Sequence, residues 1–414
     1  MSPKVIVTLS LSKGAPRSRS PAGRRDVTVR VEGLAVVLVL AAVVLEALAG
    51  VRALLRMLAT AVGAPLASAS ARPARTIAAI VPVLNEEARV GASLAALVRC
   101  GPELAEIVVV DGGSTDETPE VVANAAALDP RIRFVDASPT PSGWNGKAWN
   151  LQTGLHETTA PWLATVDADV RIGTTLLSDA VARAEADGLA ALSVATRQEL
   201  ADAGAALLHP ALLTTLVYRA GLPNVATSDP ARVQANGQVF VARRDALVRC
   251  DVFRATRASR CEDVTIARVL ASNGEHVGFF EGDAVVRMHD SWRDCAANWP
   301  RSLTLRDGFV PPVRLALALG ELLFAQALPL PTLVVLLALG DRVPFARVAT
   351  GIVLSLVMMR LGVLAGTRRA YVRPSFAYWL SPLVDVPAVA LLIVSALRRT
   401  HVWRGRVLVA EEPA

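Results

Sequence analysis

The stretch EIVVVDGGSTDET, residues 106–118, decides the fold of this chain. Four apolar residues run into Asp111 and a Gly-Gly pair, as in a strand that is buried on both faces and ends in a tight turn. Three similar runs surround it, TIAAIVPVL at residues 76–84, RIRFVD at 131–136 and WLATVDAD at 162–169. Because helix-length segments separate these runs, the sequence predicts an α/β domain with a mostly parallel sheet.

Apolar segments on both sides of this domain divide the chain into five parts. Hydrophobic residues make up 53% of the 414 residues, more than is usual for a soluble protein. We expect a disordered basic tail over residues 1–30, a transmembrane helix over 31–50 and the α/β domain over 73–310. Residues 311–400 should form about three transmembrane helices, the first kinked at PLPLP, before a tail over 401–414.

Charge and cysteine content narrow the choice of partners. The net charge of +6 does not indicate nucleic acid binding, because basic residues cluster beside the apolar runs and no recognition motif is present. The four cysteines contain no CxxC pair, so neither a zinc site nor a disulfide framework is indicated. A cleaved signal peptide is the alternative for residues 31–50, but their length favours a retained anchor.

Two aspartates at a strand end form the strongest candidate metal site. Asp167 and Asp169 directly follow the fourth apolar run, and paired carboxylates there suit Mg²⁺ or Mn²⁺ bound to phosphate oxygens. A surface Asp-x-Asp is the alternative, which the position after a strand disfavours. His289, which follows another apolar run, is a candidate third ligand or phosphate donor, with a purely structural histidine as the alternative.

Other strand ends carry candidate nucleotide-binding residues. The glycine turn after Asp111 offers backbone N–H groups, and Lys147 in NGK offers a point charge to phosphate at the start of a predicted helix. Ordinary turns and an exposed lysine are the alternatives. The candidate residues on this donor side are Pro82, Asn85, Glu86, Asp111, Ser114, Lys147 and Asp167.

Residues later in the chain are candidates for catalysis and acceptor binding. Asp263 follows Glu262 at the start of a predicted helix, where it suits a general base, although acids in a first turn are also ordinary helix-stabilising residues. Trp299 belongs to a predicted amphipathic helix suited to a membrane interface. The candidate acceptor-side residues are Asn236, Gly237, Gln238, Glu262, Trp299 and Arg301.

The ordered set PVLNE, VVVDGGSTDET, NGK, DAD, NGQ and ED resembles the motifs of family 2 inverting glycosyltransferases, over residues 76–309. The resemblance implies a Rossmann-like GT-A catalytic domain, a nucleotide-diphosphate-sugar donor such as a UDP-sugar, and a divalent metal. By position, Asp111 would contact the nucleotide base, Asp169 would hold the metal and Asp263 would be the catalytic base. The donor site would be lined by Pro82, Glu86 and Lys147.

Within that family, the arrangement of helices and the ending VWRGR, residues 402–406, resemble enzymes that glycosylate carotenoids or are associated with hopanoid synthesis. The resemblance implies transfer of a hexose to a hydroxyl of a lipid or isoprenoid. Gly112 replaces the usual second aspartate, which removes one possible contact to the base. The Gln/Arg-x-x-Arg-Trp signature of processive polysaccharide synthases is absent. Such a synthase, and a catalytically silent scaffold that binds nucleotide sugar or lipid, are the alternatives.

The expected location is the cell membrane, with several spans and a catalytic domain facing the cytoplasm. This topology contains a conflict, because the Arg-rich residues before Val31 also belong on the cytoplasmic side and one span separates them from the domain. Either the tail is translocated, or the first apolar run does not span, or the true start lies elsewhere.

Overall fold

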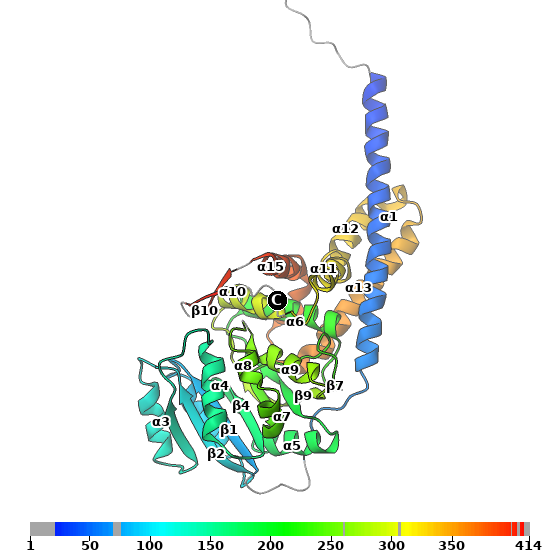
Figure 1. Ribbon diagram of the computed structural model, residues 1–414. Coiled ribbons are helices and arrows are strands. Elements are labelled where there is room, and N and C mark those ends of the chain that lie inside the picture. The colour runs from blue at the N-terminus through cyan, green and yellow to red at the C-terminus, as the bar shows by residue number, and fades with distance from the viewer. Residues whose placement is uncertain are drawn as a thin grey trace, which may run out of the picture.

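The computed structural model describes residues 21–68, 76–259, 261–304, 308–398, 400–403 and 406–409. A nine-stranded sheet with helices on both faces forms one end of the molecule, which we call the sheet domain (Figure 1). The remaining long helices form a helical bundle beside it, from which the first helix projects. The expected tail over residues 1–20 lies outside the described part of the chain.

The first half of the sheet is parallel, as the apolar runs predict. Its strands lie in the order β3 (Ile132–Asp136), β2 (Leu104–Asp111), β1 (Ile77–Val83) and β4 (Trp162–Val166). Each pairs in parallel with its neighbour, so Val83 lies opposite Asp111. The carboxyl ends of β1, β2 and β4, with their polar residues, therefore meet at one edge.

The second half of the sheet is mixed, a feature that the apolar runs do not predict. The order continues as β8 (Val239–Arg243), β6 (Ala191–Gln198), β9 (Val277–Val286) and β5 (Val170–Ile172), with β7 (Val225–Thr227) also on β9. Strand β8 runs antiparallel to both β4 and β6, whereas β6 and β9 are parallel. Strands buried on both faces carry continuous apolar runs in either orientation, so the sequence pattern does not reveal this reversal.

Alternate residues of the strands build a core on each face of the sheet. Ile77, Ala79 and Val81 pack toward one face, and Ala78 and Ile80 toward the other. The first face is covered by α2 (Val90–Val98), α3 (Thr118–Ala126) and α5 (Leu176–Ala186). The second is covered by α4 (Gly146–Glu157), α7 (Arg244–Arg249), α8 (Val252–Ala255) and α9 (Glu262–Ser272).

The N-terminal helix is longer than the sequence predicts. Helix α1 (Pro21–Thr60) begins inside the segment expected to be disordered and continues ten residues past the expected end of the span at residue 50. Its last part is stabilised by packing, because Ala49, Ala53 and Met57 recur every four residues and are buried in the bundle. The segment Gly33–Thr60 is long and apolar enough to cross a membrane.

The C-terminal helices partly match the three expected spans. Helix α13 (Ala346–Thr367) forms most of a second candidate span. Helices α11 (Pro312–Leu322) and α12 (Pro329–Leu339) meet through a π-helical turn and bend by 47°, so they are one broken span or a re-entrant loop. The third expected span is shorter than predicted, because α14 (Phe376–Trp379) ends before Pro382 and α15 (Asp385–Leu397) has 13 residues.

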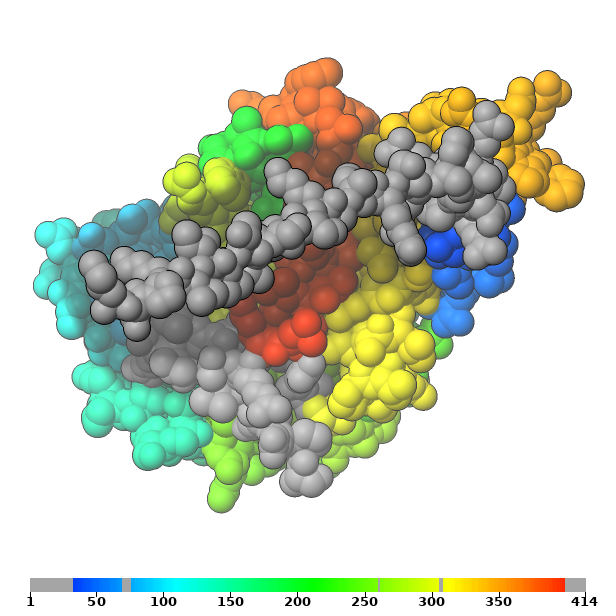
Figure 2. Space-filling model, turned by 90° about the horizontal axis from the view of Figure 1, so that it is seen from above, coloured from blue at the N-terminus to red at the C-terminus, as the bar shows by residue number. Residues whose placement is uncertain are grey.

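Two helices from the middle of the chain connect the sheet domain to the bundle. Helix α6 (Ala203–Ala220) and helix α10 (Trp292–Leu303) bury residues in the same core as α1, α11 and α15. Seen from above, the yellow and red helices of the bundle lie between the sheet domain (cyan) and the visible part of α1 (blue) (Figure 2). The expected C-terminal tail contains a two-stranded hairpin of β10 (Thr400–Trp403) and β11 (Arg406–Val409).

Candidate active site

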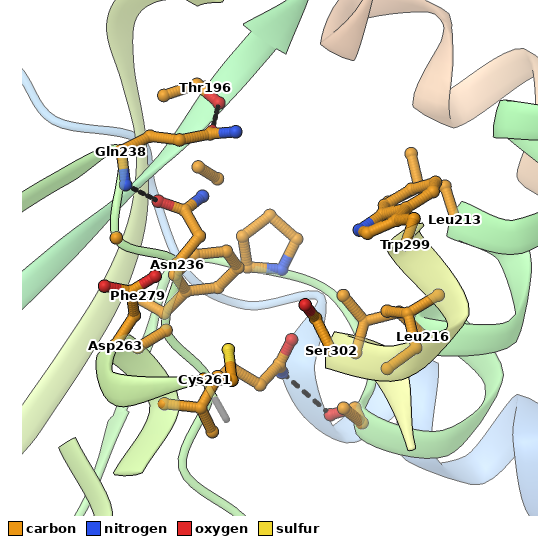
Figure 3. Close-up of a pocket in the computed structure, with 18 of the residues that line it drawn as sticks. Thr196, Leu213, Leu216, Asn236, Gln238, Cys261, Asp263, Phe279, Trp299 and Ser302 are labelled. Carbon is orange, nitrogen blue, oxygen red and sulfur yellow. Dashed lines mark hydrogen bonds between the residues drawn. The ribbon is translucent and has the colours of Figure 1, made fainter. Parts of the chain in front are cut away.

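A cavity of about 2000 Å³ lies between the carboxyl edge of the sheet and the helical bundle. It is walled by residues after β1 and β4, by α9, and by α6 and α10, and it reaches α1, α11 and α13. Most of the site residues predicted from the sequence line it, namely Pro82, Glu86, Lys147, Asp167, Asp169, Asn236, Gly237, Gln238, Glu262, Asp263, Trp299 and Arg301. Figure 3 shows Asp263 on one side of this cavity and Trp299 on the other.

Lys147 lies at the centre of an acidic cluster. Its Nζ atom is 2.9 Å from Asp167 Oδ1, 3.1 Å from Glu262 Oε1 and 3.1 Å from Asp263 Oδ1. Burial opposes its charge, yet the three carboxylates raise the pKa of Lys147 well above its usual value. The cluster joins the start of α4 and the end of β4 to α9, and Lys147 and Asp263 are 116 positions apart in the sequence.

Local contacts of the NGK turn explain how Lys147 reaches this position. Asn145 caps α4 by accepting a hydrogen bond from the backbone N–H of Lys147 at 3.1 Å. The Asn145 side chain also donates to the backbone oxygen of Ser259, three residues before α9 begins at Glu262. The turn is thus tied to the segment that carries the two acids, and the start of α4 is held next to them.

The carboxylate of Asp263 packs directly on Gly237. A Cβ atom on Gly237 would lie 1.9 Å from the Asp263 carboxyl carbon, so any larger residue here would displace that carboxylate. Burial raises the pKa of Asp263 to about 7, with Lys147 lowering it and the charges of Glu262 and Asp167 raising it. A carboxylate that titrates near neutrality, with 19% of its side chain exposed to the cavity, has the properties of a general base.

Asp169 faces a second group of charges beside the first. Burial raises the pKa of Asp169 to about 7, and the charges of Asp167 and Glu86 add to this rise. Arg89 offsets part of it, and its guanidinium also lies 2.7 Å from Asp290 and 3.7 Å from Glu86. Arg89 was not predicted from the sequence; it is the N-cap residue of α2 and follows Glu86 by three residues, in the turn before that helix.

Asp111 lies behind the cavity wall rather than in it. Its carboxylate accepts hydrogen bonds from the backbone N–H of Ser114 at 2.9 Å and from the Ser114 hydroxyl at 2.5 Å. The Ser114 hydroxyl in turn accepts from the backbone N–H of Asn85 at 2.9 Å, and the Asn85 side chain accepts from Thr115. These residues join the ends of β1 and β2 into one hydrogen-bonded edge, next to Pro82 and Gly112 of the cavity wall.

The two amide residues that were predicted for the acceptor side, Asn236 and Gln238, line the cavity. Gln238 is buried and accepts a hydrogen bond from the hydroxyl of Thr196 on β6, while its Nε2 donates to Met288 Sδ at 3.3 Å. Its backbone N–H donates to Asn236 Oδ1 at 3.3 Å (Figure 3). Thr196 lines the cavity and was not predicted, because a threonine inside a strand carries no distinguishing pattern.

His289 has a different environment from the two predicted metal ligands. Its Nδ1 is 3.1 Å from Asp294, and its ring lies near His209 and Trp299, which stack with their centroids 3.9 Å apart. Burial lowers the pKa of His289 despite the nearby carboxylate of Asp294. Its neighbours Met288 and Asp290 line the cavity, but His289 does not. Among the described residues, no group of three or more His, Cys, Asp or Glu side chains is arranged to hold a metal ion.

Residues 78–256, which include β1 to β8 of the sheet, match the family model described as Glycosyl transferase family 2. The chain carries a glycosyl transferase family 2 domain. This match confirms the family resemblance derived from the order of the motifs. Strand β9 and the base candidate on α9 lie beyond the matched residues.

Two curated proteins each match about a quarter of the chain. The lipopolysaccharide core biosynthesis glycosyltransferase LpsC of Rhizobium meliloti (strain 1021) is 36% identical over 104 residues, 25% of this chain and 35% of that protein. The glucosyl-3-phosphoglycerate synthase of Mycolicibacterium smegmatis is 34% identical over 104 residues, 24% of this chain and 33% of that protein. The chain thus spans about a third of the length of these relatives.

A solved structure resembles nearly the whole chain. The mannosyltransferase PcManGT from Pyrobaculum calidifontis, in complex with GDP-Man and Mn²⁺, aligns with a TM-score of 0.52 and 19% sequence identity. The alignment covers 87% of this chain and 98% of that one. At this identity the likeness concerns the fold, and it confirms the expected GT-A architecture flanked by apolar helices.

Proposed function

We propose that this protein transfers a hexose from a nucleotide-diphosphate sugar to a hydroxyl of a lipid or isoprenoid acceptor, with inversion at the anomeric carbon. The observation that carries the proposal is that one cavity contains the acidic residues at the strand ends, the base candidate Asp263 and apolar walls from α1, α11 and α13. A polar donor and an apolar acceptor can therefore meet in a single space beside the candidate membrane helices.

In this mechanism Asp263 takes the proton of the acceptor hydroxyl. The acceptor oxygen attacks the anomeric carbon as the bond from that carbon to the diphosphate oxygen breaks, and a single displacement inverts the configuration. A pKa of about 7 gives Asp263 a useful ionised fraction and enough basicity at physiological pH. The close contact with Gly237 holds the carboxylate in place, so little reorganisation is required.

A divalent cation, Mg²⁺ or Mn²⁺, fits the donor end of the cavity. Asp167 and Asp169 lie on one turn after β4. Burial raises the pKa of Asp169 to about 7, and repulsion from the charges of Asp167 and Glu86 adds to this rise. A cation bound to these carboxylate oxygens would relieve the repulsion. We assign the metal contact to Asp169, with Asp167 toward the metal or the ribose. The metal would neutralise charge on the departing diphosphate, and Lys147 would add a positive charge beside it. His289 stays a predicted further ligand.

The donor is expected to be a UDP-sugar. LpsC and the synthase of M. smegmatis are named as enzymes that act on quite different acceptors, so neither identifies the substrate of this chain. PcManGT was solved with GDP-Man and Mn²⁺, which supports a nucleotide sugar and a divalent metal for the same fold. The edge formed by Asp111, Ser114 and Asn85 is our candidate for contacts to the nucleoside.

A thin-layer assay with labelled donors tests this function. Purified full-length protein would be incubated with UDP-glucose, other labelled donors and a lipid extract, and the lipid phase would be separated. We expect a labelled lipid that requires Mg²⁺ or Mn²⁺ and disappears with Asp263→Asn. Asp245→Asn, an exposed carboxylate on α7 outside the cavity wall, is the matched control and should retain activity. Absence of both transfer and donor hydrolysis with every donor would contradict the proposal.

We also propose that the protein is an integral membrane protein with its sheet domain in the cytoplasm, where sugar nucleotides are available. In the part of the chain that the structure describes, two helices, or three if the bent pair is one span, have the length and composition to cross a bilayer. The last turns of α1 line the cavity, so this end of α1 must lie on the same side as the sheet domain. Reporter fusions at both termini, with protease accessibility of intact vesicles, would test this orientation.

A further inference from the structure

Charge is distributed unevenly along the cavity. The end beside the strand edges is acidic, with Glu86, Asp167 and Asp169 next to Glu262 and Asp263. The end beside the bundle is basic. Its arginines include Arg52 and Arg56 of α1, Arg219 of α6, Arg268 of α9, Arg301 of α10 and Arg314 of α11.

Arg52 and Arg56, the two arginines of α1 in this basic half, pair with one carboxylate. Glu321 lies 3.3 Å from Arg52 and 2.5 Å from Arg56, so these charges largely serve to join α1 to α11. Arg219, Arg268 and Arg301 lie deeper, and we call them the inner arginine cluster. They come from three different helices and all line the cavity.

Two members of the inner arginine cluster, Arg219 and Arg268, bring like charges together in the cavity wall. Burial, together with the charge of Arg268, lowers the pKa of Arg219 to about 10. Burial also lowers the pKa of Arg301, which the nearby charges of Cys261 and Glu262 partly offset. An anion that contacts Arg219 and Arg268 together would relieve their repulsion and replace lost hydration with charge-assisted hydrogen bonds.

The position of the cluster relates it to the acceptor side. Arg268 and Asp263 lie on the same helix, five residues or about 7.5 Å of helical rise apart. Both residues line the cavity, so one ligand can contact the two. The donor phosphates, by contrast, belong near Lys147 and Asp169 at the strand edge.

Apolar walls continue from the inner arginine cluster toward the membrane helices. Leu213 and Leu216 of α6 face the cavity opposite Asp263 (Figure 3). Beyond them, Leu317 of α11 and Met359 of α13 line the same cavity, and α13 contains a candidate membrane span. A molecule that occupies the whole cavity would therefore have a polar hydroxyl end, an anionic middle and an apolar tail.

We propose that the acceptor is an anionic lipid, whose phosphate is bound by Arg219, Arg268 and Arg301 while its hydroxyl lies at Asp263. Its apolar chain follows α6, α11 and α13. The assignment deepens the proposed function and rests on it. Guanidinium groups bind phosphate through paired N–H donors, which distinguishes this head group from the neutral hydroxyl lipid that the apolar walls alone would accept.

A binding experiment tests the cluster without requiring turnover. Full-length protein in nanodiscs of zwitterionic lipid would be titrated with octyl phosphate, with octyl glucoside as a neutral probe of the same chain length, and with UDP. We expect octyl phosphate to bind more tightly than octyl glucoside. Arg219→Gln and Arg268→Gln should each weaken the binding of octyl phosphate at least about tenfold and leave the affinity for UDP unchanged. Arg219→Lys, which keeps the charge but loses the planar donors, should have a smaller effect.

The matched control is Arg249→Gln on α7, which removes an exposed arginine outside the cavity wall and should change none of the three affinities. The proposal is overturned if octyl phosphate binds equally well to wild type and to both glutamine variants, or no better than octyl glucoside. Weakened UDP binding in these variants would instead assign the cluster to the donor. If the protein binds octyl phosphate but shows neither transfer nor donor hydrolysis, the proposed function fails while the arginine site stands.

Discussion

Replacing Asp263 by asparagine should abolish transfer and, at the same time, stabilise the folded protein at alkaline pH. Burial raises the pKa of Asp263 from its ordinary value of 3.8 to about 7. Each pKa unit corresponds to about 1.36 kcal/mol, so ionising this group costs the folded state up to about 4 kcal/mol more than the unfolded chain. Because 19% of the side chain is still exposed, solvent screening reduces this cost. We expect ionisation of Asp263 to destabilise the folded state by about 2 kcal/mol.

The sign of this effect makes the prediction specific. A carboxyl group with a raised pKa in the folded state is most stabilising when protonated, and its contribution falls as pH increases from about 4 through about 7. An asparagine at this position cannot ionise and so avoids the loss, whereas Lys147 keeps its contacts with Asp167 and Glu262. The variant should therefore melt a few degrees higher than wild type at pH 8 and at nearly the same temperature at pH 4.5.

Activity and melting would be measured on the same preparations. Loss of a general base reduces the rate by about a hundredfold to ten-thousandfold. In wild type, kcat/KM for the acceptor should rise with pH through about 7, because the ionised form of Asp263 accepts the proton. A melting difference independent of pH would refute the buried-charge reasoning. A flat pH profile between about 5 and 8, or an active Asp263→Asn variant, would refute the role of Asp263 as base.

Three further perturbations test other parts of the structure. Asp169→Ala, like removal of divalent cations with EDTA, should reduce transfer by at least about a hundredfold, and added Mn²⁺ should restore the EDTA-treated wild type but not the variant. Gly237→Ala should lower kcat with little change in donor binding. The new Cβ would lie 1.9 Å from the Asp263 carboxyl carbon and would displace the carboxylate. An unchanged kcat would show that the contact is unimportant. Arg360→Met should destabilise the bundle by about 3 to 5 kcal/mol, since it leaves Asp385 buried without its charged partner at 2.8 Å, and equal melting temperatures would contradict this.

Much of the sheet domain and most of its site could be predicted because the relevant residues stand at the ends of buried strands. The runs that end at Val83, Val110 and Val166 are buried and almost entirely apolar, and the parallel register brings their ends to one edge. Once the runs are recognised as strands, the polar residues after them must lie close together. Asp263 required a different argument, because its place depends on the order of motifs rather than on a strand end.

The reversal of the second half of the sheet was not predictable from local pattern. Strand β8 is fully apolar over Val239, Phe240, Val241 and Ala242, like the parallel strand β4 beside it. Only its pairing with β4 and β6 fixes its direction, and that information is non-local. The extra turns of α1 were missed for a related reason, since they are stabilised by tertiary packing of Ala53 and Met57 and not by hydropathy alone.

The arginines of the basic half show where sequence reasoning ends and what the folded structure adds. Arg219 lies in the last turn of an apolar helix, where a cation is ordinary, and Arg268 lies within a helix among apolar residues. Neither position suggests binding. The folded structure reveals their role, because α6 and α9 place both arginines in the cavity that also contains Asp263. There the two charges are close enough to interact, and together they favour the binding of an anion. If the acceptor is the anionic lipid that we propose, its recognition is encoded in the packing of the bundle against the sheet domain. Variants of these arginines should then alter acceptor choice while the donor end remains unchanged.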